Sequence, residues 1–339
     1  MKQLYRKLFL LAGSLFFFGF FSFAQDIHFS QFFETPLYRN PALAGLVNGD
    51  VRVQTVYRSQ WNSVANAYKT TSVNAEYKLA VAGDDYMTVG IQVLNDQAGT
   101  INLTTTQLLP AINYHKSLSE DRNIYLSLGF MGGYVQRSID RSKMTTVSTY
   151  EGIGDGETSL LQPQYSYWDG STGVSLSTQL GENPENNLVM GVAYHHFTSP
   201  KTSFYNDQKV VVQPKMVVST DAKLALDEQL TATLYNDYVT QGSYREIISG
   251  GLLGYKVGAY SDDPDVVIRG GAFYRWNDAF VPVLQLDYRA VSLSMSYDVN
   301  VSRLSKSSYG RGGYEMSLTY ANFLNRESSS ANAVRCPKF

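Results

Sequence analysis

The feature that most constrains the fold is an alternation of apolar and polar residues, which runs through segments longer than the strands of most soluble proteins. Residues 291–300 read VSLSMSYDVN, with apolar side chains at the odd positions and polar ones at the even positions. Residues 51–61, VRVQTVYRSQW, follow a similar pattern. Successive side chains of a strand point to opposite faces, so the pattern predicts sheets with one face in an apolar medium and the other in a polar one.

Fourteen segments of this kind follow one another along the chain, most of them about 10 to 14 residues long. Strands of soluble proteins average about 5 to 6 residues, whereas a tilted membrane strand needs about 9 to 11. Tyr and Trp gather near the segment ends, as expected for aromatic girdles at the membrane interfaces. The sequence therefore predicts an all-β fold, an antiparallel transmembrane β-barrel of about 14 strands. The segments lie near residues 50–61, 69–80, 86–95, 102–116, 123–137, 168–180, 187–197, 211–224, 229–240, 244–257, 265–276, 279–289, 291–300 and 312–322.

The connections between these segments support the same interpretation, because a bacterial barrel with an even strand count has short turns in the periplasm and longer loops outside. The connections at 81–85, 225–228 and 289–290 are short, and all three are expected in the periplasm. The longest, about 138–167 and 198–210, are expected outside, although the eleventh connection, WND, is also expected there and is short. A soluble secreted sandwich or propeller is the alternative, but it does not need so many long segments with polar residues facing inward.

Composition excludes several classes of function. Charged residues make up 17% of the chain, against about 25% in ordinary soluble domains. The net charge of −2 creates no long-range field that favours nucleic acid. The single cysteine, Cys336, excludes a disulfide framework and a cysteine-rich zinc site. We expect a free or inert thiol there, with an intermolecular disulfide as the alternative.

The N-terminus has the features of a secretory signal peptide. Basic residues precede an apolar run that ends at Phe23, and a small residue, Ala24, supplies the cleavage site. We expect residues 1–24 to be the signal peptide and residues 25–48 an N-terminal plug or periplasmic rim segment. Residues 49–322 are expected to form the transmembrane barrel, and residues 323–339 a periplasmic C-terminal tail.

The stretch AQDIHFSQFFETPLYRNPALAGL, residues 24–46, fits neither a strand nor a helix. The residues before Pro36 and Pro41 are biased toward extended geometry, and Gly45 permits a sharp redirection into the first strand. Its apolar side chains are too many to leave in water, which predicts an ordered plug or cap at the periplasmic mouth. The residues expected to form this plug, or to contact a periplasmic partner, are Phe29, Phe32, Phe33, Pro36, Tyr38, Asn40, Pro41 and Gly45.

The charged residues predicted to face the lumen have both signs. A ring of one sign is typical of an ion-selective pore, whereas mixed signs favour ion pairs or a polar plug. They are Arg52, Arg58, Glu76, Lys78, Lys223, Asp237, Arg269, Arg275, Asp287, Arg289 and Asp298.

The search for catalytic or metal-binding chemistry gives no site. Adjacent strand residues point to opposite faces, so His195 and His196 do not easily share one ion. The acidic stretches GDGE and SDDPD lack the ligand spacing of a calcium loop. No Ser/His/Asp arrangement is indicated by spacing. We expect no catalytic residues, no cofactor and no metal.

The mature N-terminus, QDIHFSQFFETPLYRNPALAGL, with RSQW following at residues 58–61, closely resembles the PorP/SprF family. These are outer-membrane proteins of Bacteroidota linked to type IX secretion and gliding motility. SYDVNVSRLSKSSYGRGGYEMSLTY at 296–320 and RCPKF at 335–339 resemble the family's closing strands and terminal signature. The resemblance implies a fourteen-stranded outer-membrane barrel of a Gram-negative cell. It also implies a type IX-secreted adhesin as partner, received through its C-terminal sorting domain, and contact with periplasmic secretion components and outer-membrane lipid.

Three functions remain open. The first is a partner that assists secretion or surface anchoring of the adhesin, with its outer loops as a docking surface. The second is a passive or gated channel for small solutes, which requires an open lumen. The third is a barrel-embedded hydrolase, which requires a triad that the spacing does not indicate. The docking residues of the first hypothesis are Tyr150, Tyr165, Tyr167, Trp168, Phe204 and Tyr205.

Overall fold

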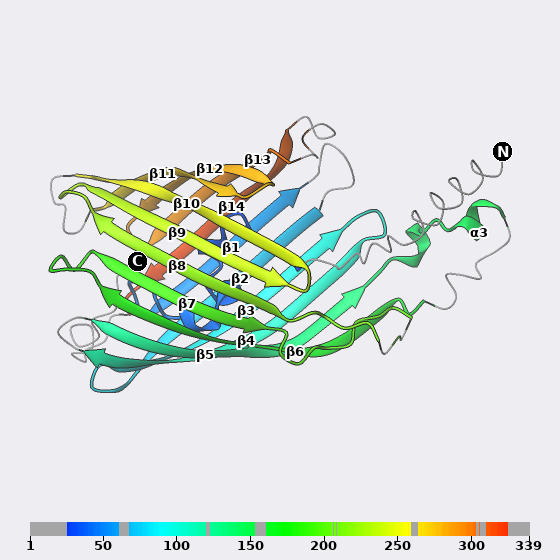
Figure 1. Ribbon diagram of the computed structural model, residues 1–339, viewed down its shortest axis with the longest axis horizontal. Coiled ribbons are helices and arrows are strands. Elements are labelled where there is room, and N and C mark those ends of the chain that lie inside the picture. Colours follow the sequence, from blue (N-terminus) through cyan, green and yellow to red (C-terminus); the bar gives the residue numbers. More distant parts are fainter. Residues whose placement is uncertain are drawn as a thin grey trace, which may run out of the picture.

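The described residues form one closed antiparallel barrel of 14 strands (Figure 1). The computed structural model describes residues 26–60, 68–119, 123–152, 161–258 except 206 and 208, 264–302, 305 and 310–324. Each strand pairs with its neighbours in sequence, and the last strand closes the ring against the first. The predicted fold class and strand number are therefore confirmed. The strands are β1 (Val51–Gln60), β2 (Tyr68–Ala82), β3 (Asp85–Ala98), β4 (Leu103–Ser119), β5 (Ile124–Ser138), β6 (Gln164–Gln179), β7 (Asn187–His195), β8 (Lys215–Ala225), β9 (Leu230–Gln241), β10 (Tyr244–Val257), β11 (Val266–Arg275), β12 (Ala279–Tyr288), β13 (Val291–Asn300) and β14 (Arg311–Asn322).

The two ends of the barrel differ. At one end, β1 begins, β14 ends and short connections such as 83–84 and 289–290 join the strands. We call this the turn end. The other, the loop end, carries the two longest connections, 139–163 and 196–214. The first of these contains the short helices η3 (Arg141–Lys143) and α3 (Val147–Tyr150), which project beyond the barrel in Figure 1.

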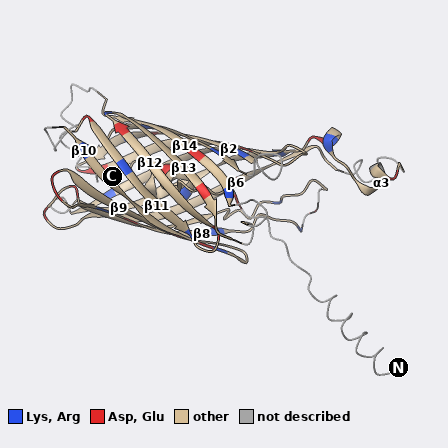
Figure 2. Cartoon of the chain, turned by 90° about the horizontal axis from the view of Figure 1, so that it is seen from above, with Lys and Arg blue, Asp and Glu red and all other residues tan. Residues whose placement is uncertain are grey.

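Burial follows the alternation of the sequence. In β1, Arg52, Gln54 and Val56 are buried, whereas Val53, between Arg52 and Gln54, is exposed on the outer face. The exposed outer residues of the other strands are mainly apolar, and Figure 2 shows how little of the wall is charged. A sheet that turns apolar groups outward and polar groups inward is stable when lipid surrounds it.

Several strand boundaries differ by up to four residues from those predicted, and those of β6 and β4 are two of them. β6 begins at Gln164 rather than near 168, so Tyr165 and Tyr167 are strand residues and not loop residues. β4 extends over 17 residues, to Ser119. In both cases pairing with β5 continues the ladder past the point where the sequence stops alternating.

Within residues 26–50, three short helices precede the barrel: η1 (Phe32–Glu34), α2 (Pro36–Arg39) and η2 (Pro41–Leu43). Among the described residues, no helix has both the length and the hydropathy needed to cross a membrane. Some predicted features lie outside the described residues: the signal peptide, Trp61, and the part of the tail that contains Cys336. All of GDGE and the first three residues of SDDPD also lie outside them.

The outward face predicts how charge substitutions affect stability. Leu284, 61% exposed at the middle of β12, should not tolerate Leu284→Arg, because a charge there is moved into hydrocarbon. We expect a loss of about 2–4 kcal/mol in guanidinium titrations in lipid vesicles. Leu226→Arg, at a residue 58% exposed in the turn after β8, should cost less than about 1 kcal/mol. Equal losses would contradict the assignment of this face to lipid.

Candidate functional site

The N-terminal segment, defined here as residues 26–48, lies along the inside of the barrel. Its first residue, Asp26, contacts Lys215 and His196 at the loop end. Its last part lies at the turn end, where the carbonyl of Val47 accepts a hydrogen bond from Lys78 Nζ at 2.5 Å. Figure 1 shows the dark blue segment within the ring of strands. The segment therefore extends from the turn end into the loop-end half of the lumen, rather than along one rim alone.

Arg39, the last residue of α2, is held by two carboxylates of the inner wall. Its Nη1 lies 2.6 Å from Asp221 Oδ2 of β8, and its Nε lies 2.8 Å from Asp237 Oδ1 of β9. The Arg39 side chain is only 4% exposed, and those of the two aspartates 9% and 4%. One guanidinium thus neutralises two carboxylates that lie diagonally across neighbouring strands.

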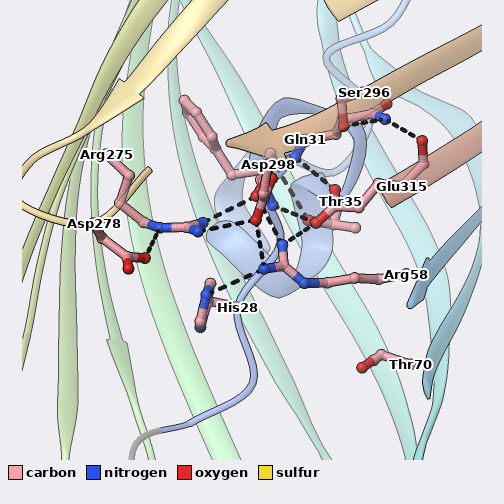
Figure 3. Close-up of polar contacts among 12 residues, drawn as sticks. His28, Gln31, Thr35, Arg58, Thr70, Arg275, Asp278, Ser296, Asp298 and Glu315 are labelled. Atoms are coloured by element: carbon pink, nitrogen blue, oxygen red, sulfur yellow. Dashed lines mark hydrogen bonds and ion pairs between the residues drawn. The ribbon is translucent and has the colours of Figure 1, made fainter. Parts of the chain in front are cut away.

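A second cluster joins the segment to β1, β11, β13 and β14 (Figure 3). The backbone N–H groups of Ser30 and Gln31 donate to the Glu315 carboxylate at 2.6 and 2.7 Å. Arg58 forms ion pairs with Glu315 and with Asp298, the latter at 3.0 Å.

Asp298 in turn accepts from a second arginine of the wall. Arg275 Nη2 lies 3.0 Å from Asp298 Oδ2, and its Nη1 donates to Ser30 Oγ at 2.9 Å. The predicted lumen positions of Arg58, Arg275 and Asp298 are therefore observed, and the structure adds Glu315 and Ser30 to the same cluster.

A third cluster lies nearer the turn end. Arg52 of β1 pairs with Glu76 of β2 at 2.7 Å, and the same carboxylate accepts the backbone N–H of Gly45 at 2.8 Å. Gly45 has φ +81°, and a Cβ there would overlap the Thr88 side chain, so only glycine suits this close approach. Glu34 is also buried, and it accepts hydrogen bonds from Gln54 and, at 3.1 Å, from Thr319.

The stretch from Asn40 to Ala44 fits the wall of β4 to β7 closely. Asn113 Nδ2 donates to the carbonyls of Ala42 at 2.8 Å and Ala44 at 2.9 Å. A Cβ at Gly173 of β6 would overlap the Asn40 amide, which shows how near the two elements approach. The wall thus supplies both the space and the hydrogen-bond partners that an irregular backbone needs.

Aromatic residues complete the packing of the segment. Phe32 and Phe33 pack against Phe273 of β11, with ring centroids 5.5 and 5.1 Å from it. Phe29 contacts Tyr38 edge-on at 5.9 Å. Of the residues that the sequence analysis named in this segment, Phe33 and Tyr38 are half-buried and the others are buried.

One predicted lumen residue takes another position, whereas Arg269 and Asp287 keep the inward parity of their strands. Arg269 and Asp287 form a partly buried ion pair with each other on β11 and β12. Arg289 is a correction: it lies in the two-residue turn after β12 with φ +51°, and its exposed side chain pairs with Asp265 at 2.9 Å. The alternating pattern was extended one residue too far, because the strand ends at Tyr288.

Above the segment, a cavity of about 1060 Å³ opens among the loop-end residues. Residues 26–28 line it, with Asp26 held by Lys215 and His196. Burial alone would raise the pKa of the Asp26 carboxyl, but Lys215 and His196 hold that pKa well below its usual range. Burial opposes the charge of His196, but the hydrogen bonds that its ring donates to the carboxylates of Asp169 and Asp26 raise its pKa to about 9, so the imidazolium is charged at neutral pH.

The predicted docking residues divide into two groups. Tyr165, Tyr167 and Phe204 line the cavity. Trp168 points outward from β6 with 71% of its surface exposed, where its ring contacts Tyr134 edge-on. The remaining two, Tyr150 in α3 and Tyr205, are exposed and do not line the cavity.

The described part of the chain contains no metal-binding cluster. No group of three or more His, Cys, Asp or Glu side chains there is arranged to hold an ion. His195 instead contacts Ser171 Oγ at 3.0 Å and the Arg39 carbonyl at 3.2 Å.

The sequence analysis missed Asp26, Asp169, Asp221 and Glu315. Strand parity was the available signal for Asp221 and Glu315, whereas nothing local marks Asp26.

Comparisons with known proteins agree with the barrel fold and with the family that the sequence resembles. A family model described as "Type IX secretion system membrane protein PorP/SprF" matches residues 21–320. No curated protein matches the chain. Among solved structures, the P. putida toluene transporter TodX aligns with a TM-score of 0.50 at 11% identity, covering 86% of this chain and 95% of that one. The Ralstonia pickettii toluene transporter TbuX aligns with a TM-score of 0.45 at 12% identity, covering 85% and 92%. At this identity the first likeness shows the barrel fold alone.

Loss of the buried arginine of α2 should be costly. Arg39→Ala leaves Asp221 and Asp237 buried without a counter-charge, so we expect a loss of about 3–5 kcal/mol in unfolding free energy. Arg289→Ala is the matched control, since its exposed pair with Asp265 is worth about 0–1 kcal/mol. The combination of Arg39→Met with Asp221→Asn and Asp237→Asn should recover most of the loss. Equal effects of Arg39→Ala and Arg289→Ala would contradict the arrangement.

The close approach at β6 gives a second prediction. Gly173→Ala forces its Cβ onto the Asn40 amide, and we expect a loss of about 1–3 kcal/mol from overpacking. A Cβ at Gly270 of β11 meets no atom within 4 Å, so Gly270→Ala should stay within about 0.5 kcal/mol of the parent. In a double-mutant cycle, the effects of Gly173→Ala and Asn40→Ala should not add. Additive effects would show that the two residues do not touch.

Proposed function

Because the chain belongs to the PorP/SprF family of type IX secretion system membrane proteins, we propose that this non-enzymatic outer-membrane barrel is the partner of a type IX-secreted surface adhesin. In this proposal the barrel receives the adhesin's C-terminal sorting domain at its loop end and assists its secretion or its anchoring on the surface. The longer connections of bacterial barrels lie outside the cell, so the loop end is the one that a surface protein meets.

The observation that carries the proposal is that the N-terminal segment fills the lumen up to a cavity at the loop end. The N-terminal segment is bound to the wall by Arg39, by the hydrogen bonds to Glu315 and by those to Glu76. The cavity above it opens at the loop end. A barrel filled in this way supports a role as a docking platform, in which the segment acts as a fixed plug, better than a role as a conduit for solutes.

The plug role and the channel alternative make opposite predictions for conductance. The purified barrel in a planar bilayer should pass almost no ion current, because buried ion pairs hold the segment in the lumen. Arg39→Ala combined with Gly173→Ala, which loosens two separate contacts of the segment, should produce transient openings. Steady conductance of the unaltered protein, equal to that of the double variant, would favour the channel.

The secretion role is tested in the cell. Deleting the gene should remove at least one large type IX-secreted protein from the surface, as measured by mass spectrometry of surface-labelled cells. Purification of the tagged barrel from detergent-solubilised outer membrane should recover the same protein. Unchanged amounts of every type IX substrate on the deletion strain would overturn the proposal.

A further inference from the structure

One wall of the loop-end cavity combines an arginine with three aromatic rings. Arg137 is the next-to-last residue of β5, and its Nη1 donates to Tyr165 Oη at 3.3 Å and to Thr202 Oγ1 at 3.4 Å. Tyr165 is stacked on Tyr167, with centroids 6.2 Å apart, and meets Phe204 edge-on at 4.7 Å. All of these residues line the cavity. We call them the Arg137 wall.

Arg137 differs from the cations at the bottom of the cavity, which have carboxylate partners. Arg275 pairs with Asp278 and Asp298, and Lys215 pairs with Asp26. Among the described residues, the hydrogen bonds of Arg137 reach only hydroxyl groups, and its buried Nε has no acceptor. A guanidinium presents five donors in a planar fork, so most of the capacity of this one is unused.

The acidic residue in the same row of the wall forms no direct ion pair with Arg137. Asp96 of β3 lies two strands away, with Thr105 of β4 between them in the register. Its carboxylate accepts the hydroxyl of Thr70 at 2.6 Å. The charge of Arg137 therefore faces a cavity rather than a counter-ion of the described wall, and a carboxylate is the group whose geometry matches a guanidinium in two-point contact.

The surroundings of Arg137 favour a polypeptide as the source of that carboxylate. Tyrosine and arginine side chains in a concave, partly desolvated site are the composition of protein–protein hot spots. The rings are fixed by each other, and Tyr165 Oη also contacts Thr202 Oγ1. The volume of about 1060 Å³ exceeds that of most small-molecule sites, at about 300–1,000 Å³, and accommodates several residues of an extended chain.

We propose that the Arg137 wall binds an extended polypeptide segment, with a carboxylate of that segment on the Arg137 guanidinium and its neighbouring side chains against Tyr165, Tyr167 and Phe204. The inference rests on the proposed function and names the contact through which a secreted partner is held. Two sources supply the same chemistry, the C-terminal carboxylate of the segment and an Asp or Glu side chain within it.

Affinity selection with synthetic peptides tests the proposal. The full-length barrel, immobilised in detergent, is incubated with four pools of random octapeptides: with or without Asp and Glu, each with a free or an amidated C-terminus. We expect retention only of pools that carry a carboxylate. If the pool without Asp and Glu is retained with a free C-terminus but not with an amidated one, the terminal carboxylate is the bound group. If both pools that contain Asp and Glu are retained, with a free and with an amidated C-terminus, the side-chain carboxylate is the bound group.

Substitutions identify the residue that holds the peptide. Arg137→Gln should lower retention by at least about tenfold, because a charge-assisted hydrogen bond contributes at least that factor to binding. Arg137→Lys should bind more weakly than the parent but better than Arg137→Gln. Arg289→Gln, at the opposite end of the barrel, is the matched control and should bind like the parent.

Several results would overturn the proposal. These are retention of the amidated pool without Asp and Glu at the level of the others, equal binding by the parent and Arg137→Gln, or binding of oligosaccharides to the cavity in place of peptides. The pool comparison needs no variant, so it stands even where Arg137→Gln fails to fold. It also needs no secreted protein, so a failure here is distinct from unchanged adhesin levels in the deletion strain.

Discussion

Buried charges on the inner wall of this barrel need partners, and the N-terminal segment supplies several that the wall lacks. Removing one member of a buried pair leaves an uncompensated charge, which costs about 3–5 kcal/mol. Arg39 neutralises Asp221 and Asp237, which would otherwise repel each other on adjacent strands. Backbone N–H groups of the segment stabilise the carboxylates of Glu315 and Glu76. Wall and segment therefore form one electrostatic unit.

The dependence also runs in the opposite direction. Irregular backbone is tolerated at membrane depth only where protein or water satisfies its polar groups. The helices of the segment contain three or four residues each, so most of their carbonyls have no helical partner. Asn113 and Ser175 of the wall bind the carbonyl of Ala42, and Asn113 also binds that of Ala44. This explains why inward positions carry side chains with donors and acceptors where a solid apolar core would otherwise form.

The fold could be predicted from the sequence because its signal is local, whereas the site depends on contacts between distant residues. A period of two over ten residues decides the strand, its outer face and its length. Nothing local indicates that Arg39 meets a carboxylate 198 positions later, or that Asp26 lies near the loop end. The error at Arg289 has a related cause, since alternation cannot show where a strand gives way to a turn of φ +51°. The start of β6 was missed because pairing with β5, rather than the pattern of QYSYW, sets it.

The energetics of the lumen also limit what binding at the loop end can do. To displace the segment, a ligand must break the ion pairs of Arg39 and the three backbone hydrogen bonds to Glu315 and Glu76. At about 3–5 kcal/mol for the ion pairs and about 1.5–3 kcal/mol for each hydrogen bond to a charged group, the cost is about 8–14 kcal/mol. A ligand with nanomolar affinity gains about 12 kcal/mol in total. Such a ligand would use nearly all of its binding free energy to open the lumen. A ligand that occupies the cavity and leaves the segment in place avoids this cost. Tight binding at the loop end is therefore favoured when the lumen stays filled.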